Sequence, residues 1–204
     1  MHIIKTFYAS AIIVWILTAL SGCATITPPA APKSTLSWDD RKSLLTRLQN
    51  WQLNGKIAVT TAQDSGSASV DWAQRAQNYT ISLYGPLGAN GITLTGSPGR
   101  VNMQASNGQK ATASSAEQLI AQQWGWKLPV SYLKYWVRGL PVPNLPQNSR
   151  FDESHRLLTL NQQGFTIQYA DYTTSGNLEL PQRLTINSST LKSKIVIYKW
   201  NISN

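Results

Sequence analysis

Cysteine and histidine are almost missing from this chain of 204 residues. Cys23 is the only cysteine, so no disulfide can form within the chain and no cysteine pair can hold a metal ion. Histidine occurs only as His2 and His155, which leaves no histidine cluster for zinc. No glycine-rich loop of the phosphate-binding type follows a predicted strand. The sequence therefore predicts no cofactor, no metal site and no catalytic residues.

Carboxylates are also scarce, with 9 Asp and Glu against 18 Lys and Arg and a formal net charge of +9. Such an excess of positive charge suits nucleic acid, anionic lipid or an acidic protein as partner. The basic residues are scattered along the chain rather than clustered, which argues against nucleic acid. Two interpretations of the charge stay open, a contribution to solubility and an acidic partner.

The chain also lacks an apolar run long enough to span a bilayer. The run at residues 7–20 holds about 14 residues, whereas a spanning helix needs about 18 or more. Lys5 precedes this run and small residues follow it, as is typical of a secretory signal peptide. The sequence Leu-Ser-Gly-Cys ending at Cys23 resembles the lipobox of bacterial lipoproteins, in which the signal is removed before an acylated cysteine. We therefore expect residues 1–22 to be a signal peptide and Cys23 to carry lipid.

The segment after Cys23 predicts where the protein resides. In lipoproteins of bacteria with two membranes, Asp at the next position commonly retains the protein in the inner membrane. This chain has Ala24, so by resemblance we expect a lipid anchor in the outer membrane, with the protein on its periplasmic face. Residues 23–37 are rich in proline and small polar residues and predict a flexible tether. Residues 38–204 are long enough for a single domain with a sizeable core.

Apolar and polar residues alternate in short runs over residues 51–104, with Gly, Pro and Asn between the runs. Alternation of period two predicts antiparallel strands with one apolar face. Strands are predicted again at residues 156–160, 165–172, 183–188 and 191–202. The last of these carries apolar residues on both faces, so we expect it to be covered on both sides.

Three short helices accompany these strands. Ser37 is a suitable cap for a helix at residues 38–50, and Ser114 with Glu117 fits a capping box before a second helix. A third helix is predicted at residues 132–138. The fold class that follows is α+β, with one large curved antiparallel sheet and a few helices packed against its concave face.

Leu87 lies among glycine and proline residues in the predicted turn at residues 84–91. Turns between strands are normally polar, so a large aliphatic side chain at this position needs a reason. Two interpretations stay open: a leucine folded back over the sheet edge, and an apolar probe for a membrane or a partner. Burial of one leucine contributes about 1.5–3 kcal/mol in the second case.

Several stretches, in order along the chain, resemble the LolB family of outer-membrane lipoprotein receptors. They are the lipobox at Cys23, WQLNGKIAV at 51–59, YGPLG at 84–88, NGQ at 107–109, LPVSYLKYWVRGLP at 128–141, and the final strand ending near Trp200. The resemblance implies an incomplete β-barrel with helices inside its concave face and a hydrophobic cavity for acyl chains between them. It further implies a monomer that accepts client lipoproteins from the periplasmic carrier LolA and inserts them into the lipid of the outer membrane.

The same resemblance implies the site residues. Pro86, Leu87 and Gly88 form the membrane-insertion loop on this view. The expected acyl-chain cavity is lined by the alternating apolar residues Val59, Val70, Trp72, Ile81, Leu83, Ile92, Leu94, Trp136, Ile167 and Tyr169. This set depends on strand register, since a shift of one residue moves a whole strand's side chains to the other face.

Two other functions are compatible with an exported lipoprotein. The first is a scaffold of an outer-membrane assembly machine, which has a filled core and takes up no lipid. The second is a hydrolase of cell-envelope material, for which His155 would have to serve as general base. His155 follows Asp152 and Glu153 in what reads as a polar loop, so a solvated loop histidine is the favoured interpretation.

Overall fold

The computed structural model describes residues 36–85, 88 and 90–203. The expected signal peptide, the lipid-bearing Cys23 and nearly all of the tether therefore lie outside the described residues. Pro86 and Leu87 of the expected insertion loop also lie outside them.

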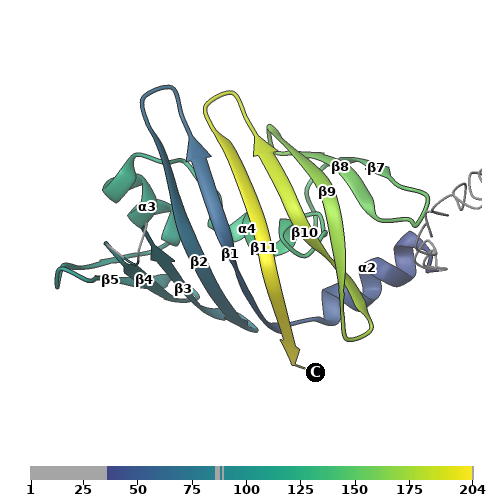
Figure 1. Cartoon of the computed structure of the whole chain (residues 1–204), viewed down its shortest axis with the longest axis horizontal. Helices are drawn as coiled ribbons and strands as arrows, with labels where there is room; N and C mark the ends of the chain where they lie inside the picture. The colour runs from purple at the N-terminus through teal and green to yellow at the C-terminus, as the bar shows by residue number, and fades with distance from the viewer. Residues whose placement is uncertain (1–35, 86–87, 89, 204) are drawn as a thin grey trace, which may run out of the picture. The chain divides into compact units, whose positions relative to one another are not determined.

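One antiparallel sheet of 11 strands makes up most of the described chain (Figure 1). Its strands are β1 (Asn50–Thr60), β2 (Ser65–Arg75), β3 (Asn78–Tyr84), β4 (Ile92–Ser97), β5 (Arg100–Ala105), β6 (Lys110–Ala113), β7 (Asn148–Phe151), β8 (Leu157–Gln162), β9 (Phe165–Ser175), β10 (Leu178–Asn187) and β11 (Lys192–Ser203). Their order in the sheet is β6-β5-β4-β3-β2-β1-β11-β10-β9-β8-β7. Strands that follow each other along the chain mostly pair as hairpins, and β1 with β11 joins the two halves. Since β6 and β7 are the two edges, the sheet is not closed.

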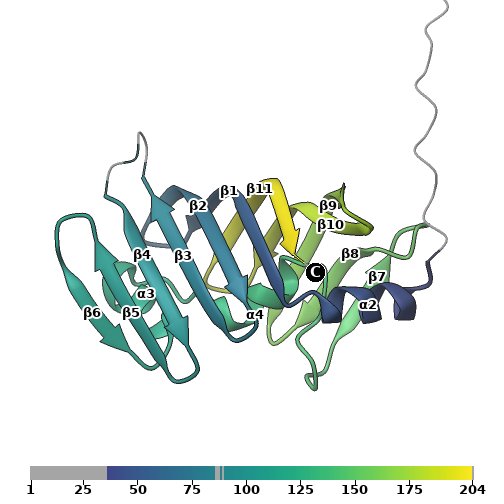
Figure 2. The same ribbon diagram turned by 90° about the horizontal axis from the view of Figure 1, so that it is seen from below.

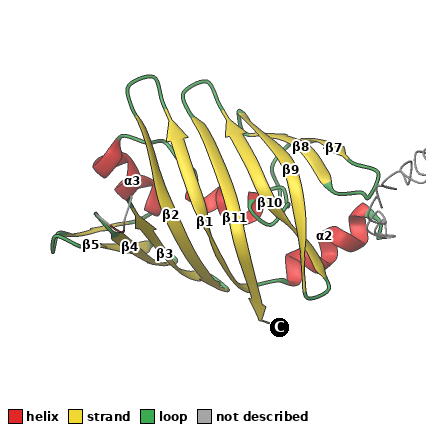
Figure 3. Cartoon of the chain, viewed as in Figure 1, coloured by secondary structure: helices red, strands yellow, loops and turns green. Residues whose placement is uncertain are grey.

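Three helices accompany the sheet, namely α2 (Trp38–Arg47), α3 (Ala116–Trp124) and α4 (Val130–Trp136). Figure 2 shows the sheet curving around α3 and α4, which lie on its concave side, and Figure 3 shows the same helices in red behind the strands. The predicted α+β class, with an incomplete β-barrel and helices on its concave face, is confirmed. Strand β7 was not predicted, and β10 starts five residues earlier than expected, at Leu178.

The helix ends differ from the predictions in detail. Ser37 does cap α2, because its side chain accepts a hydrogen bond from the backbone N–H of Asp40 at 3.2 Å. The helix ends earlier than predicted, since β1 already begins at Asn50. The cap of α3 is Ser115 rather than the predicted Ser114, and the carboxylate of Glu117 instead accepts from the backbone N–H of Ser131 at 2.6 Å.

The start of α4 was also predicted too late. The helix begins at Val130, two residues before the predicted start, and the residue before it, Pro129, makes no side-chain cap. Its end is a Schellman motif, in which Gly139 has φ 75° and donates its N–H to the carbonyl of Trp136. The N–H of Leu140 bonds to the carbonyl of Tyr135 in the same motif.

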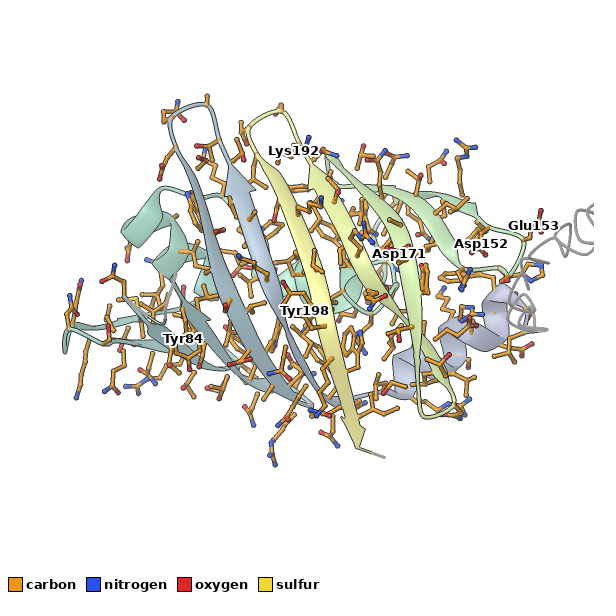
Figure 4. All side chains as sticks on the ribbon, in the orientation of Figure 1. Tyr84, Asp152, Glu153, Asp171, Lys192 and Tyr198 are labelled. Atoms are coloured by element: carbon orange, nitrogen blue, oxygen red, sulfur yellow. The ribbon has the colours of Figure 1, made fainter. Side chains whose placement is uncertain are left out.

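The prediction that the last strand is covered on both faces is wrong, because β11 contains a β-bulge. Asn54 pairs with Lys199 while the next residue, Gly55, pairs with Ile197, so Tyr198 is the extra residue. A bulge inverts the alternation of side chains, and Ile197 before it and Trp200 after it therefore both face the core. Tyr198 is 65% exposed and lies on the face of β11 that is turned away from the helices (Figure 4).

Gly55 lies opposite this bulge, where the two strands approach closely. A Cβ atom at position 55 would lie 2.3 Å from the carbonyl oxygen of Val196. Only glycine fits such a contact between backbones. The glycine of the WQLNGKIAV stretch is thus explained by the bulge in β11.

A network of ion pairs fixes α2 to the far half of the sheet. The guanidinium of Arg41, which is 3% exposed, donates to the carboxylate of Glu179 at 2.7 Å and to the carbonyl of Ser154 at 3.2 Å. Arg156 bridges the other oxygen of Glu179, at 3.2 Å, and the carboxylate of Asp152, at 2.8 Å. This network holds α2, the first described helix, against β10 and the loop before β8.

Replacement of Asp152 by asparagine should lower the free energy of unfolding near neutral pH by about 1–2 kcal/mol. Burial disfavours the ionised carboxylate, but hydrogen bonds from Arg156 and from the backbone N–H of Ser154 outweigh that effect and lower the pKa of Asp152. A lowered pKa stabilises the fold above the unfolded-state pKa of about 4, and this contribution is lost as the pH falls through the lower folded-state value.

Urea unfolding at about pH 7 and about pH 3 measures this contribution, because the gap between wild type and Asp152→Asn should shrink at the lower pH. Asp171→Asn is the matched control, since it removes a carboxylate from an exposed ion pair with Arg183 and should have a smaller effect at either pH. A gap of equal size at both pH values would contradict the assignment.

Candidate functional site

An apolar cavity of about 40 Å³ lies between the sheet and the helices α3 and α4. Every described side chain that lines it is apolar or aromatic: Leu53, Ile57, Val70, Trp72, Ile81, Leu83, Leu94, Ile120, Leu128, Val130, Leu133, Val137 and Ile195. Its volume is far below the roughly 300–1,000 Å³ that is typical of ligand pockets. A cavity with no polar group in its wall stays dry and accepts apolar matter in preference to water.

Strand pairing assembles the sheet side of this cavity. Leu53 lies opposite Trp72, Trp72 opposite Ile81, and Ile81 opposite Leu94, so one row of side chains crosses β1 to β4. Directly paired residues point to the same face of a sheet. A second row pairs Val70 with Leu83. Alternation in each strand, together with this register, therefore brings the apolar side chains together on the concave face.

The helical side of the cavity comes from a short stretch of the chain. Ile120 of α3 and Leu128 contribute from one end, and Val130, Leu133 and Val137 contribute from α4. The last three are spaced by three and four residues, so they form one stripe along the helix. The spacing of this stripe is visible in the sequence, but the alternating residues of the strands alone do not indicate it.

Five of the ten residues expected to line an acyl-chain cavity line this one. They are Val70, Trp72, Ile81, Leu83 and Leu94. The other five are buried elsewhere in the core, namely Val59, Ile92, Trp136, Ile167 and Tyr169. Sequence reasoning also missed Leu53 and Ile57, although they belong to the same alternating run as Val59.

The C-terminal end of α4 is held by polar contacts to the sheet. Gln162 is 3% exposed, and its amide oxygen accepts from the indole N–H of Trp136 at 3.2 Å and from the backbone N–H of Val142 at 2.9 Å. Its amide nitrogen donates to the carbonyl of Val142 at 2.9 Å. The hydroxyl of Tyr169 donates to the carbonyl of Trp136 at 3.1 Å, and burial raises the pKa of Tyr169, which keeps this donor protonated.

Arg138 ties the same end of α4 to α2. Its Nη1 donates to the carbonyls of Leu48 at 2.7 Å and Leu45 at 3.2 Å, where α2 ends. Burial lowers the pKa of Arg138 to about 10, so the side chain keeps its charge at neutral pH. In contrast, α3 contributes the apolar residues Leu119 and Ile120 to the core, and the bond from Ser131 to Glu117 joins α3 to the start of α4.

The remaining expected site residues lie at the edge of the described chain or beyond it. Gly88 is exposed with φ 79°, and its N–H donates to the carbonyl of Gly85 at 3.1 Å, which defines a tight turn between β3 and β4. His155 is exposed in a turn held by Asp152, the position of a solvated loop histidine. Within residues 36–85, 88 and 90–203, no three His, Cys, Asp or Glu side chains are grouped to hold a metal ion. In the same ranges no helix is long and apolar enough to cross a bilayer.

Comparison with known protein families gives one match that spans most of the chain. The family described as outer membrane lipoprotein LolB matches residues 49–200. The outer-membrane lipoprotein LolB of Pseudomonas syringae is 38% identical over 197 residues, which cover 95% of this chain and 96% of that protein. The protein of the same name from Pseudomonas fluorescens is 38% identical over 187 residues, with 90% and 91% covered.

Solved structures with a similar fold are distant in sequence. A putative outer membrane lipoprotein-sorting protein domain from Vibrio parahaemolyticus has a TM-score of 0.55 at 7% identity, covering 81% of this chain and 90% of that chain. A LolA superfamily protein from Nitrosomonas europaea has a TM-score of 0.51 at 8% identity, covering 80% and 94%. At such identities the likeness concerns the fold alone, an open curved sheet with helices on its concave side.

Proposed function

This chain belongs to the LolB family of outer-membrane lipoproteins, and from that premise we propose that it receives lipoproteins from the periplasmic carrier LolA in the cavity under α3 and α4 and inserts them into the outer membrane. The family acts in lipoprotein localization, and its members are lipid-anchored at the outer membrane and are not a known enzyme family. The observation that carries the proposal is the cavity wall, which is apolar throughout.

The anchor belongs to the same proposal. Residues 1–22 are removed as a signal peptide, Cys23 carries the acyl chains, and residues 23–37 are the tether of a single lipoprotein-binding domain at 38–204. Two or more acyl chains hold a protein firmly in a bilayer. A tether of about 14 residues reaches at most about 50 Å when fully extended. The domain therefore works close to the membrane that receives its cargo.

Acyl chains need a carrier because water excludes them. Three chains of about 15 methylenes each cost on the order of 35 kcal/mol to expose, at about 0.8 kcal/mol per methylene. Transfer from one apolar cavity to another avoids that exposed state. Such a transfer needs no nucleotide if this cavity binds the chains better than the donor does and the bilayer binds them better still. No catalytic step is required of this chain.

The cavity must widen to hold acyl chains, because about 40 Å³ is far too small for them. Widening is easiest on the side of α3 and Leu128, because they contribute only apolar side chains to the described wall. The C-terminal end of α4 is held in place by Gln162 and Arg138. We therefore assign the movement to α3 and the segment leading into α4, while the end of α4 stays fixed.

Val70→Phe tests the cavity directly. The larger side chain fills the space, so uptake of a radiolabelled lipoprotein from LolA by the purified chain should fall by about tenfold. Val59→Phe is the matched control, because Val59 is equally buried but does not line the cavity. Both variants should lose about 1–3 kcal/mol of stability from overpacking. Equal uptake by the two variants would place the cargo elsewhere.

The small volume of the cavity also favours a second candidate, a scaffold lipoprotein of an outer-membrane assembly machine that takes up no lipid. The two candidates differ in their response to a fluorescent apolar probe. Probe binding that Val70→Phe abolishes would support lipoprotein transfer. A folded wild-type protein that binds neither probe nor lipoprotein would support the scaffold.

A further inference from the structure

A groove of about 400 Å³ lies where β2 turns into β3. Parts of α2, α4 and residues 140–147 form its other walls. Three cationic side chains line it, Lys42, Lys134 and Arg138, and no carboxylate belongs to its lining in the described part of the chain. Since every charged side chain in this described lining is cationic, the groove favours the binding of an anion.

Two of these cations, Lys134 and Arg138, are held in place by their surroundings. The ammonium of Lys134 lies 5.2 Å, and the guanidinium carbon of Arg138 lies 5.5 Å, from the centre of the Tyr135 ring. Arg138 donates to the backbone carbonyls of Leu45 and Leu48 and, through Nε, to that of Lys134. These partners are neutral, so they orient the guanidinium without cancelling its charge.

A smaller hollow of about 190 Å³ lies between this groove and the apolar cavity and shares lining residues with each. It shares Gln74, Gln77 and Lys134 with the groove. It shares Trp72 and Val130 with the cavity. Groove, hollow and cavity therefore lie in series, with Trp72 and Val130 as the wall between the last two.

The wall is polar on one side and apolar on the other. The indole N–H of Trp72 donates to the side-chain oxygen of Gln74 at 3.1 Å, on the side of the groove, while the ring itself lines the cavity. Among the described residues Glu117 is the one carboxylate that lines the hollow, and it accepts from the backbone N–H of Ser131 at 2.6 Å. The path from groove to cavity thus changes from cationic to wholly apolar.

We propose that this path binds an anionic glycerophospholipid, with its phosphate against Lys42, Lys134 and Arg138 and one acyl chain passing Trp72 and Val130 into the cavity. An anionic head joined to an alkyl tail matches the two ends of the path in order. An acidic peptide would use the groove but has no tail for the cavity. The acylated cysteine of a lipoprotein has a blocked amino group and no charge near its acyl chains, so it has no use for the cations.

The inference rests on the proposed function, because the lipid tail enters the same cavity as the cargo. Any acyl chain that enters the cavity stabilises its widened form. Phospholipid is the amphiphile that the domain meets at the inner surface of the outer membrane. It occupies the cavity between deliveries and competes with lipoproteins for it.

Photocrosslinking of the full-length lipoprotein in vesicles tests this site. The vesicles contain phosphatidylcholine and a small share of phosphatidylglycerol with a photoactivatable group at the end of one acyl chain. Peptide mapping should find crosslinks at Trp72 and Val130. The double variant Lys42→Gln/Lys134→Gln should lower them by about tenfold, as expected for two lost contacts with an anionic head group. The control Lys192→Gln/Lys199→Gln changes the same charge at exposed positions of β11 and should leave the crosslinks unchanged.

Two further measurements in the same experiment identify the ligand. Diacylglycerol with the same photoactivatable chain should crosslink as weakly as the double variant does with phosphatidylglycerol. Inorganic phosphate at millimolar concentration should not compete, because the acyl chain supplies much of the affinity. Equal crosslinking by the two lipids, displacement by phosphate, or crosslinks confined to exposed positions would each overturn the proposal. Uptake of lipoprotein by the wild type in the same vesicles separates this failure from failure of the transfer function itself.

Discussion

Leu87→Glu should leave uptake of lipoproteins from LolA intact and slow their delivery to liposomes by about a hundredfold. Leu87 belongs to the sequence stretch YGPLG at 84–88 and is proposed to enter the membrane. Burial of a leucine contributes about 1.5–3 kcal/mol, which glutamate forfeits while adding the cost of bringing a charge to the lipid surface. Uptake depends on the cavity, whose described lining comes from the sheet, from α3 and from α4 with the residues beside it. Transfer of a radiolabelled lipoprotein, first from LolA and then to liposomes, measures the two steps separately.

Ala62→Glu is the matched control for this experiment. Ala62 is exposed in the turn between β1 and β2, so the variant adds the same charge to another hairpin of the sheet. It should deliver cargo at the wild-type rate. Delivery by Leu87→Glu at that rate as well would reject the membrane-probe role. Loss of uptake by a folded Leu87→Glu protein would show that residue 87 serves the cavity or the carrier instead.

Gln162→Leu should lower the free energy of unfolding by about 3 kcal/mol or more. The leucine is close to glutamine in size but offers no hydrogen bond. The indole N–H of Trp136 would then be left in the core without its partner, and the partly buried N–H and carbonyl of Val142 would lose theirs. Each unsatisfied buried group costs about 1–3 kcal/mol. Urea unfolding followed by tryptophan fluorescence measures the change.

Gln168→Leu is the control, because it makes the same change of residue type at an exposed position. Gln168 is exposed on β9, the strand next to the one that carries Gln162, so its replacement should change stability by about 0.5 kcal/mol at most. A similar loss in both variants would mean that Gln162 does not hold α4. Gln162→Leu should also weaken lipoprotein uptake, because the fixed end of α4 is the base from which the cavity is proposed to open.

Local pattern was enough to predict much of the sheet and part of the site. Period-two alternation marked the strands from β1 to β5, and it put Val70, Trp72, Ile81, Leu83 and Leu94 on one face, because side chains in a strand alternate whatever lies beyond it. The ordered stretches from the lipobox to the region of Trp200 indicated the LolB family. These features depend on residues close together in the chain.

Features that depend on distant partners were not predictable in the same way. No residue near Arg41 in the sequence indicates its partner, and it is buried against Glu179, 138 residues further along the chain. The bulge at Tyr198 depends on how β11 pairs with β1, and it reversed the expected faces of the last strand. The one-residue error in the cap of α3 arose because two serines stand side by side and only packing selects Ser115.

The sequence by itself determined the strand pattern, the expected anchor at Cys23 and the family of this protein, since all three are recognised from short stretches of residue types. Only the tertiary structure decided which apolar residues enclose the cavity, how small it is, and which end of α4 is held. Those properties follow from strand register, from one bulge and from a few buried hydrogen bonds between residues far apart in the chain. Packing of that kind is set by the whole fold at once, and no local pattern encodes it.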